Sequence, residues 1–287
     1  EIMAIARKYG IKVIEDVSHA QGGYYKGRKL GTIGDVGAMS LMTGKSFAIG
    51  EGGMFVTNDR EIYERAIALG HYERFNDSIE TQYLRPYKGL PLGGCKFRMH
   101  QVSSAVGRVQ LKYYDQRIQE IDKAMNYFWD QLEGVPGIRA IRPPKDSGST
   151  MAGWYAARGH YVSEELGGLS VARFCEALRA EGVPVSAGCN LPLHLHPIFQ
   201  DADVYGHGKP TNIAHASRDL RPVKGSLPVA EGIAEKVFAL PWFKHFRPEL
   251  IDQYIHAFRK VCSNYEQLLA DDKGNPALIG AWNTSQR

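Results

Sequence analysis

The chain has 287 residues, of which 44% are hydrophobic, and this is enough apolar material for one or two domains with a sizeable core. The formal net charge of +4 comes without a long basic run, so it gives no indication of nucleic-acid binding, although it suits anionic ligands. No apolar stretch approaches the roughly 20 residues of a membrane span, no signal-peptide pattern opens the chain, and the four cysteines lack CxxC spacing; we therefore expect free thiols and a cytoplasmic protein without a membrane contact.

The first residues predict the end of a helix followed by a strand. Apolar residues recur on one helical face of segment 1–9, and Gly10 is a suitable residue just past a helix end. The β-branched run 12–16 then predicts a buried parallel strand with Asp16 at its carboxyl end. Open α/β sheets place ligand chemistry at that end, although an aspartate there can also serve as a turn or cap residue.

The next predicted strand, 36–42, runs into a glycine-bracketed turn that contains Lys45. A lysine between small residues and hydroxyls at the end of a strand is placed like a lysine that forms a Schiff base. An amine attacks an aldehyde only when it is neutral, and burial lowers the pKa of a lysine. The alternative is a surface lysine after a strand. The glycine-rich run 50–53 then leads into a third strand at 53–57.

Beyond this point the pattern predicts a helix at 60–69, capped by Asn58 or Asp59, and a long polar loop at 70–99. The remaining elements that we expect are a long helix at 101–132, a strand within 155–162, a helix capped by Ser170 and a last helix at 250–269. We divide the chain into a first domain with its connecting helix at 1–135, a smaller α+β domain at 136–270, and a loose tail at 271–287.

Several motifs, in the same order and spacing, resemble the DegT/DnrJ/StrS family of pyridoxal-phosphate (PLP) sugar aminotransferases. The resemblance covers residues 1 to about 268. The segments that carry it are VIEDVSHAQG at 13–22, YKGR at 25–28, GTIGDVG at 31–37, Ser40, Lys45, GEGG at 50–53, VTND at 56–59 and GCKFRM at 94–99.

The resemblance implies roles toward PLP for five residues. Lys45 would form the Schiff base with the cofactor and move the substrate proton, and Asp16 would pair with the pyridine nitrogen. His19 would lie beside the ring, and Ser40 would donate to the phosphate; the plain alternatives are a helix-start histidine and a serine bonded to the backbone. Lys96 departs from the family pattern, which usually has an asparagine that reaches the phosphate of the neighbouring subunit's cofactor, but lysine also binds phosphate.

His194 follows a Pro-Leu pair that resembles the substrate-side segment of the family, and we give it a substrate-binding role. His194 and His196 share a proline-containing loop, and such a pair can indicate a metal. No cluster of cysteines or acids supports them, so the sequence predicts no metal site.

The resemblance implies an α/β protein: a fold-type-I PLP-dependent transferase, with part of the large parallel or mixed sheet domain and a small α+β C-terminal domain, acting as a homodimer. It implies ping-pong transfer of an amino group from glutamate or glutamine to a keto sugar, with a nucleotide-linked sugar as the first expectation. The loops at 70–96 and 186–209 would choose the acceptor, and they carry no readable code.

Three alternatives stay open. The acceptor could be a cyclitol or another non-nucleotide ketone, because Lys45 would serve every acceptor. A dehydratase of the same family has a histidine in place of the lysine, so Lys45 argues against it. Because the chain begins in mid-helix and the resemblance starts well inside the large domain, we expect the chain to lack an N-terminal part of the cofactor site. A truncated, non-catalytic binding module is therefore the third alternative.

Overall fold

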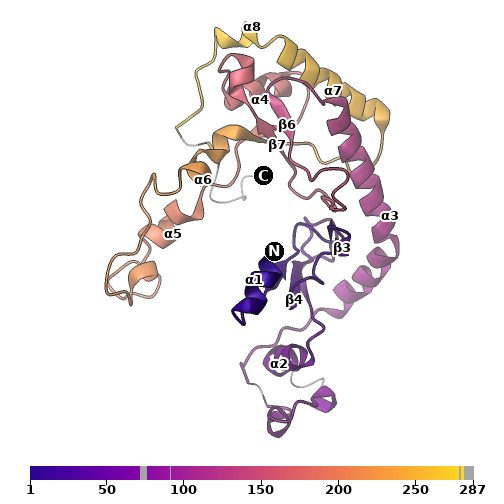
Figure 1. The fold of residues 1–287 in the computed structure, drawn as a ribbon, viewed down its shortest axis with the longest axis vertical. Helices are drawn as coiled ribbons and strands as arrows, with labels where there is room; N and C mark the ends of the chain where they lie inside the picture. Colours follow the sequence, from indigo (N-terminus) through magenta and orange to yellow (C-terminus); the bar gives the residue numbers. More distant parts are fainter. Residues whose placement is uncertain (72–75, 91, 278, 281–287) are drawn as a thin grey trace. The chain divides into compact units, whose positions relative to one another are not determined.

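The computed structural model describes residues 1–71, 76–90, 92–277 and 279–280 (Figure 1). The chain forms two compact units. Unit 1 contains 1–125, 142–155 and 244–246, and unit 2 contains 126–141, 156–243 and 247–287. Within the described ranges, no helix combines the length and the apolar character that a membrane span requires. The predicted domain boundary at residue 135 stays a prediction.

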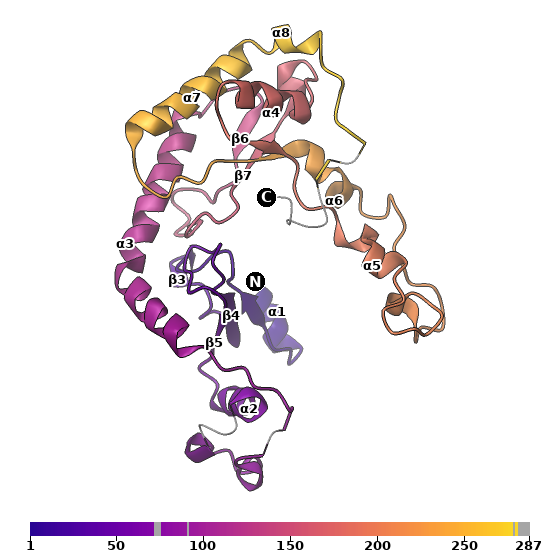
Figure 2. The same ribbon diagram turned by 180° about the vertical axis from the view of Figure 1, so that it is seen from behind.

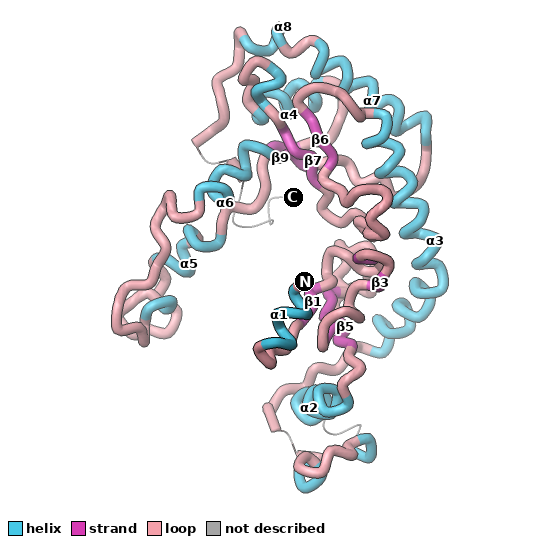
Figure 3. The backbone as a smooth tube through the Cα atoms, viewed as in Figure 1, coloured by secondary structure: helices cyan, strands magenta, loops and turns pink. Residues whose placement is uncertain are grey.

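Unit 1 is built on a mixed sheet in the order β1-β4-β5 (Figure 3). β1 (Ile14–Asp16) runs parallel to β4 (Val36–Ser40), and β5 (Gly53–Val56) runs antiparallel to β4. All three strands lie within the ranges predicted for them, and the parallel direction of β1 is confirmed. Its predicted burial is wrong: the Ile14 side chain is 68% exposed, because no described element covers that face of this edge strand.

A small hairpin of β2 (Tyr24–Tyr25) and β3 (Arg28–Lys29) lies between β1 and β4 in the chain. Its turn residues, Lys26 and Gly27, both have positive φ angles, as a two-residue hairpin turn requires. The backbone N–H groups of Tyr24 and Lys26 donate to the hydroxyls of Thr150 and Ser149. These bonds explain why segment 142–155 belongs to unit 1 although it lies far along the chain.

The helices of unit 1 are α1 (Ile2–Lys8), α2 (Arg60–Gly70) and the beginning of α3 (Gln101–Gln131) (Figure 2). Gly10 follows α1 with a φ of +65°, which confirms its predicted place after a helix end. Two short 3-10 turns, η1 (Asn76–Ser78) and η2 (Arg85–Tyr87), interrupt the predicted loop at 70–99. Residues 72–75 and 91 of that loop lie outside the described residues.

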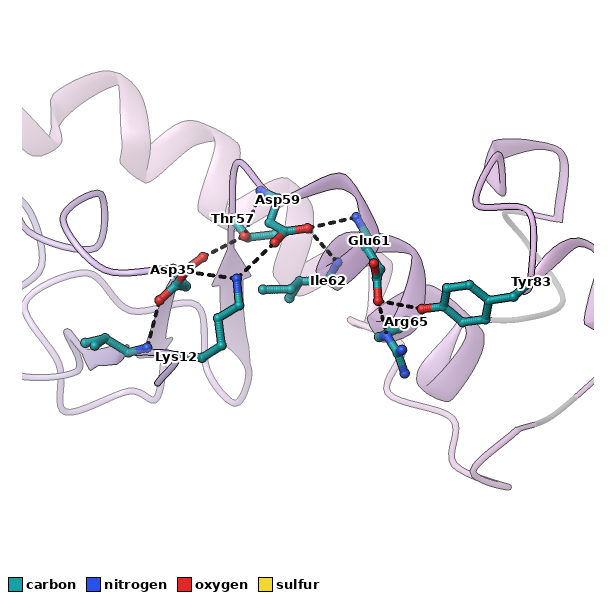
Figure 4. Close-up of polar contacts among 9 residues, drawn as sticks. Lys12, Asp35, Thr57, Asp59, Glu61, Ile62, Arg65 and Tyr83 are labelled. Atoms are coloured by element: carbon teal, nitrogen blue, oxygen red, sulfur yellow. Dashed lines mark hydrogen bonds and ion pairs between the residues drawn. The ribbon is translucent and has the colours of Figure 1, made fainter. Parts of the chain in front are cut away.

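A polar cluster joins the beginnings of β1, β4 and α2 (Figure 4). Of the two predicted cap residues, Asp59 is the one that caps α2, because its carboxylate accepts from the N–H groups of Glu61 and Ile62. Lys12 Nζ lies 3.2 Å from Asp35 Oδ1 and 3.4 Å from Asp59 Oδ2. The cluster therefore connects the edge strand to the helix.

Unit 2 contains an antiparallel sheet in the order β6-β7-β9-β8, and Figure 3 labels the first three of these strands. Its strands and helices are β6 (Ile138–Ala140), β7 (Arg158–Tyr161), β8 (Ser186–Ala187), β9 (Val237–Ala239), α4 (Val171–Ala180), α5 (Pro197–Gln200), α6 (Pro228–Gly232), α7 (Pro248–Ser263) and α8 (Glu266–Leu269). Short 3-10 turns lie at η3 (Ser163–Leu166), η4 (Leu193–Leu195), η5 (Thr211–Ile213) and η6 (Ile233–Lys236).

The core of unit 2 is a group of aromatic rings from different elements. Phe174, Phe238 and Phe258 are fully buried, and their ring centroids lie 5.6 to 6.1 Å apart, the range in which aromatic pairs attract. The ring of Phe128, near the end of α3, packs against that of Phe258, with the two centroids 5.3 Å apart. Gly159 of β7 leaves the space that the Phe238 ring occupies, since a Cβ there would lie 2.3 Å from it.

The sequence predictions for unit 2 agree with the structure except near the C-terminus. The predicted strand in 155–162 is β7, and Ser170 caps α4 by accepting from Arg173 N–H at 3.1 Å. The predicted helix at 250–269 is interrupted, because Asn264 ends α7 and its side chain donates to Lys260 O.

The predicted tail at 271–287 is not loose at its start. The Asp272 carboxylate accepts from both the N–H and the hydroxyl of Ser170, and Asn275 Oδ1 accepts from Ala172 N–H. These residues complete the capping of α4, which is why they are held. Residues 278 and 281–287 lie outside the described residues.

Glu64 of α2 is a charged residue that binds the backbone of the loop after the helix. Its side chain is fully buried and accepts from the N–H groups of Glu80 and Thr81 at 2.9 and 2.7 Å and from Arg60 Nε at 2.6 Å. Burial raises the pKa of the Glu64 carboxyl, but hydrogen bonds from Thr81, Arg60 and Glu80 outweigh burial and lower the pKa from 4.5 to about 2.

Replacing Glu64 by glutamine should lower the free energy of unfolding by about 1.5–3 kcal/mol, because buried N–H groups lose a charged acceptor. Urea unfolding at pH 7 measures this loss, and Glu61→Gln, on the exposed face of the same helix, should cost less. The pKa of Glu64 is lowered on folding, so its stabilisation is present above pH 4.5 and disappears as the pH falls toward about 2. Equal stability of wild type and Glu64→Gln at pH 7 would contradict this role.

Candidate active site

Asp16 ends β1, at the edge of the sheet where the polar loops of unit 1 emerge. Its Oδ1 accepts from Ser18 N–H at 3.0 Å. The hydrogen bonds from Ser18 lower the pKa of Asp16; burial opposes this, and the nearby His19, when protonated, and Lys45 add to the lowering. The structure therefore provides an ionised carboxylate at the end of β1, and its pairing with a pyridine nitrogen stays a prediction.

Lys45 lies in the loop after β4 and is half-buried. Its backbone N–H donates to Met42 O at 2.9 Å, which closes a turn around Gly44. The ammonium nitrogen lies 4.3 Å from the centroid of the Tyr155 ring, within the range of a cation–π contact. An aromatic face thus contacts the lysine from the segment 142–155, which the chain order alone does not bring near it.

His19 contacts the same tyrosine. Its ring centroid lies 4.5 Å from that of Tyr155, with the planes tilted by 52°. Burial lowers the pKa of His19, the charge of Lys45 lowers it further, and Asp16 opposes both. The structure therefore places His19 and Lys45 against the same tyrosine ring, and their roles toward a cofactor stay predictions.

Ser40 ends β4 and is connected to the Asp16 loop through Ser18. The N–H of Ser40 donates to Ser18 Oγ at 3.0 Å, and its own Oγ accepts from Met42 N–H at 3.3 Å. A hydroxyl that accepts one such bond keeps its proton as a donor. Ser40 thus makes the backbone contact that was its alternative, and its hydroxyl keeps a proton to donate; its phosphate role stays a prediction.

Lys96 is exposed and lines a cavity of about 1370 Å³ together with Asp16 and Ser18. The other walls come from β4, β5, α2 and the segment before α3; they are Ala38, Met39, Glu51 to Phe55, Tyr63, Ala66, Ile67, Leu69 to His71 and Phe97 to His100. The cavity is mostly apolar with a few polar groups, which is typical of a ligand site. Lys96 therefore shares a cavity with the carboxylate of the site.

His194 lies in the 3-10 turn η4 of unit 2. Its Nε2 lies 2.9 Å from Glu231 Oε1, and Glu231 also accepts from the N–H groups of Gly225 and Leu227. The hydrogen bond with His194 is the main reason why the pKa of Glu231 is lowered. The observed contact connects two loops of unit 2, and the substrate role of His194 stays a prediction.

Four residues near Lys45 were not predicted from the sequence: Tyr155, Gln21, Ser46 and Tyr114. Gln21 and Ser46 are buried; Gln21 stands inside the motif at 13–22, and Ser46 directly follows Lys45. A polar residue so close to a predicted site residue was the available signal: Gln21 lies two residues after His19, and Ser46 one after Lys45. Tyr114 and Tyr155 lie far from Lys45 in sequence, and no motif marks them.

The donor set of unit 1 combines one primary amine, one ionised carboxylate, one histidine with a lowered pKa and one hydroxyl. An amine can take up an aldehyde covalently, and a carboxylate can hold a protonated heterocyclic nitrogen. The set therefore fits an aldehyde-bearing, anionic heterocycle. Among the residues that the structure describes, no group of three histidine, cysteine or acidic side chains could hold a metal ion.

Comparison with known proteins gives one family. A model of the DegT/DnrJ/EryC1/StrS aminotransferase family matches residues 1–259. A putative L-glutamine:3-amino-2,3-dideoxy-scyllo-inosose aminotransferase of Micromonospora echinospora is 29% identical over 270 residues, which cover 92% of this chain and 61% of the relative. A dTDP-3-amino-3,4,6-trideoxy-alpha-D-glucose transaminase of Streptomyces venezuelae is 28% identical over 266 residues, which cover 92% of this chain and 60% of the relative.

A solved structure of DesV from S. venezuelae is also similar. It matches with a TM-score of 0.67 at 25% identity, over 92% of this chain and 61% of that chain. The chain spans about three-fifths of the length of the curated relatives that it matches.

The coupling among the three charged residues predicts the titration of His19. In wild type, the pKa of His19 should lie below the ordinary histidine value; Lys45→Ala should raise this pKa and Asp16→Asn should lower it further. NMR titration of the His19 Cε1–H signal, assigned with His19→Gln, measures all three. Because folding lowers this pKa, protonation of His19 costs stability as the pH falls below about 6.5. A His19 pKa that neither substitution moves would contradict the grouping of these residues.

Proposed function

Because the chain belongs to the DegT/DnrJ/EryC1/StrS aminotransferase family, we propose that it carries the catalytic lysine of a PLP-dependent aminotransferase that acts on a keto sugar. The observation that carries this proposal is that His19 and Lys45 both contact the Tyr155 ring, at 4.5 and 4.3 Å, at the end of the sheet where Asp16 closes β1. An amine, a carboxylate and a histidine at one site are consistent with the chemistry of PLP-dependent aminotransferases. The fold-type-I assignment and a homodimer are part of the same proposal.

PLP, when bound, supplies an aldehyde that takes up the amino group and a pyridine ring that accepts electrons from the breaking C–H bond. Lys45 Nζ would hold the cofactor covalently, and the released amine would then move the proton at the α carbon of the donor. Asp16 would hold the protonated pyridine nitrogen, and its lowered pKa keeps it ionised for this purpose.

His19 and the two phosphate residues would orient the ring. The lowered pKa of His19 favours the neutral imidazole, which can lie against a heterocycle without adding a positive charge. Ser40 Oγ would donate to the phosphate with the proton that it keeps. Lys96 would add a positive charge at the rim of the cavity shared with Asp16.

We propose glutamate or glutamine as the amino donor and a cyclic keto sugar as the acceptor. A nucleotide-linked sugar corresponds to the S. venezuelae transaminase, and a cyclitol ketone corresponds to the M. echinospora relative, which keeps the second candidate in place. Lys45 favours amino transfer over the dehydratase alternative, which has a histidine at this position. A substrate role for His194 in unit 2 belongs to this proposal.

The covalent role of Lys45 can be tested by titrating the chain with PLP. Wild type should develop a yellow absorption band that bleaches with L-glutamate, and borohydride reduction followed by peptide mass analysis should locate the adduct on Lys45. Lys45→Ala should lose the band, whereas Lys112→Ala, on the exposed face of α3, should keep it. An adduct spread equally over surface lysines, with no glutamate response, would reject the proposal and favour the non-catalytic module.

A further inference from the structure

The side chain of Gln21 is buried beside the loop that carries Lys45. It is 3% exposed, and all four of its hydrogen-bonding positions are used. Its Nε2 donates to Ser40 O at 2.5 Å and to Phe47 O at 3.4 Å. Its Oε1 accepts from Ser46 Oγ and from Phe47 N–H, each at 3.0 Å. One amide thus connects the end of β4 to the residues that follow Lys45.

This arrangement closes the segment 40–47 into a loop with Lys45 near its end. Ser40 is bound before the turn, and Ser46 and Phe47 are bound directly after Lys45. The turn itself is closed by the Lys45 N–H to Met42 O bond. The Cα of Lys45 therefore has fixed neighbours on both sides, while its side chain extends toward Tyr155.

Tyr114 of α3 contacts residues of the same loop. Its hydroxyl lies 2.8 Å from Ser46 Oγ and donates to Gln21 O at 3.0 Å. Burial raises the pKa of Tyr114 to about 12, so the hydroxyl keeps its proton at neutral pH. The ring meets Phe47 edge to face at 4.9 Å. The Tyr114 hydroxyl thus lies against both Gln21 and Ser46, and its ring lies against Phe47.

Close packing leaves this cluster little room to rearrange. A Cβ at Gly153 would lie 2.3 Å from Ser46 Cβ, so only glycine fits against the serine there. Gly22, next to Gln21, has a φ of +74°, a conformation that glycine adopts without strain. A fully bonded polar network in a tight site is rigid, and losing one member leaves the others unsatisfied.

We propose, building on the proposed function of Lys45, that Gln21 is a positioning residue that sets the place of the lysine amine relative to Asp16 and Ser40. Ser46 and Tyr114 hold Gln21 in turn. A displacement of about 1 Å in a reacting group can cost roughly a hundredfold in rate. A loop fixed by one amide therefore has a direct effect on the reactivity of Lys45 that is separate from the stability of the fold.

The test compares Gln21→Glu with wild type. The substitution keeps the size of the side chain but turns the two donors of Nε2 into an acceptor that faces Ser40 O and Phe47 O. We expect the rate of borohydride-trapped PLP labelling at Lys45, measured relative to the exposed Lys112 in the same sample, to fall roughly ten- to a hundredfold. Hydrogen exchange in the peptide 41–47 should become faster, while the melting temperature is recorded for each variant.

Two further variants keep the test decisive if the buried glutamate prevents folding. Gln21→Met removes the four bonds without adding a charge, and Tyr114→Phe removes one hydroxyl and keeps the ring contact with Phe47. We expect the order of Lys45 labelling to be wild type, then Tyr114→Phe, then Gln21→Met. Gln116→Glu, an exposed glutamine of α3, is the matched control and should behave as wild type.

The outcomes separate this inference from the proposed function. If Gln21→Met and Tyr114→Phe fold, and either the exchange of 41–47 or the Lys45 to Lys112 labelling ratio equals that of wild type, Gln21 is only a core residue and the inference is overturned. If wild-type Lys45 is labelled no faster than Lys112, the proposed function fails, and the hold of Gln21 on the loop is still decided by hydrogen exchange.

Discussion

The parallel pairing of β1 with β4 decides where the residues of the candidate site lie in unit 1. Asp16 stands opposite Ala38 in this register, so β1 and β4 end at the same edge of the sheet. The chain leaves both strands there, and the loops that follow carry His19 and Lys45. Ser18 and Gln21 then bind the two loops together, since both contact Ser40. A shift of this register would separate the carboxylate from the amine.

The charges at this edge explain one another. Asp16 is held ionised by hydrogen bonds from Ser18 and by the positive charge of Lys45, and His19 is held toward its neutral form by burial and by Lys45. Tyr155 presents its ring to both His19 and Lys45. A lysine amine and a carboxylate for the pyridine nitrogen are groups that PLP-dependent enzymes use, and membership of the DegT/DnrJ/EryC1/StrS family agrees with this pair.

The sequence was sufficient for local structure and for the residues that stand in motifs. The β-branched run before Asp16, the glycines around Lys45 and the cap residues Asp59 and Ser170 depend on short-range chemistry, so the elements that they predict are present. The sequence was insufficient where an outcome depends on distant partners. The exposure of Ile14 depends on which segments cover the sheet.

Tyr155 could not be predicted for the same reason, and its setting is unusual. It stands between Trp154 and Ala156, which with Ala152 have positive φ angles, a strained backbone that only the surrounding structure can impose.

The central claim is that Lys45 and Asp16 hold one PLP molecule between them. A crystal structure of the chain grown with PLP tests it most directly. The claim predicts electron density that continues from Lys45 Nζ into the cofactor, with the Asp16 carboxylate at the pyridine nitrogen. Cofactor density at another lysine, or a ring nitrogen with no contact to Asp16, would contradict it.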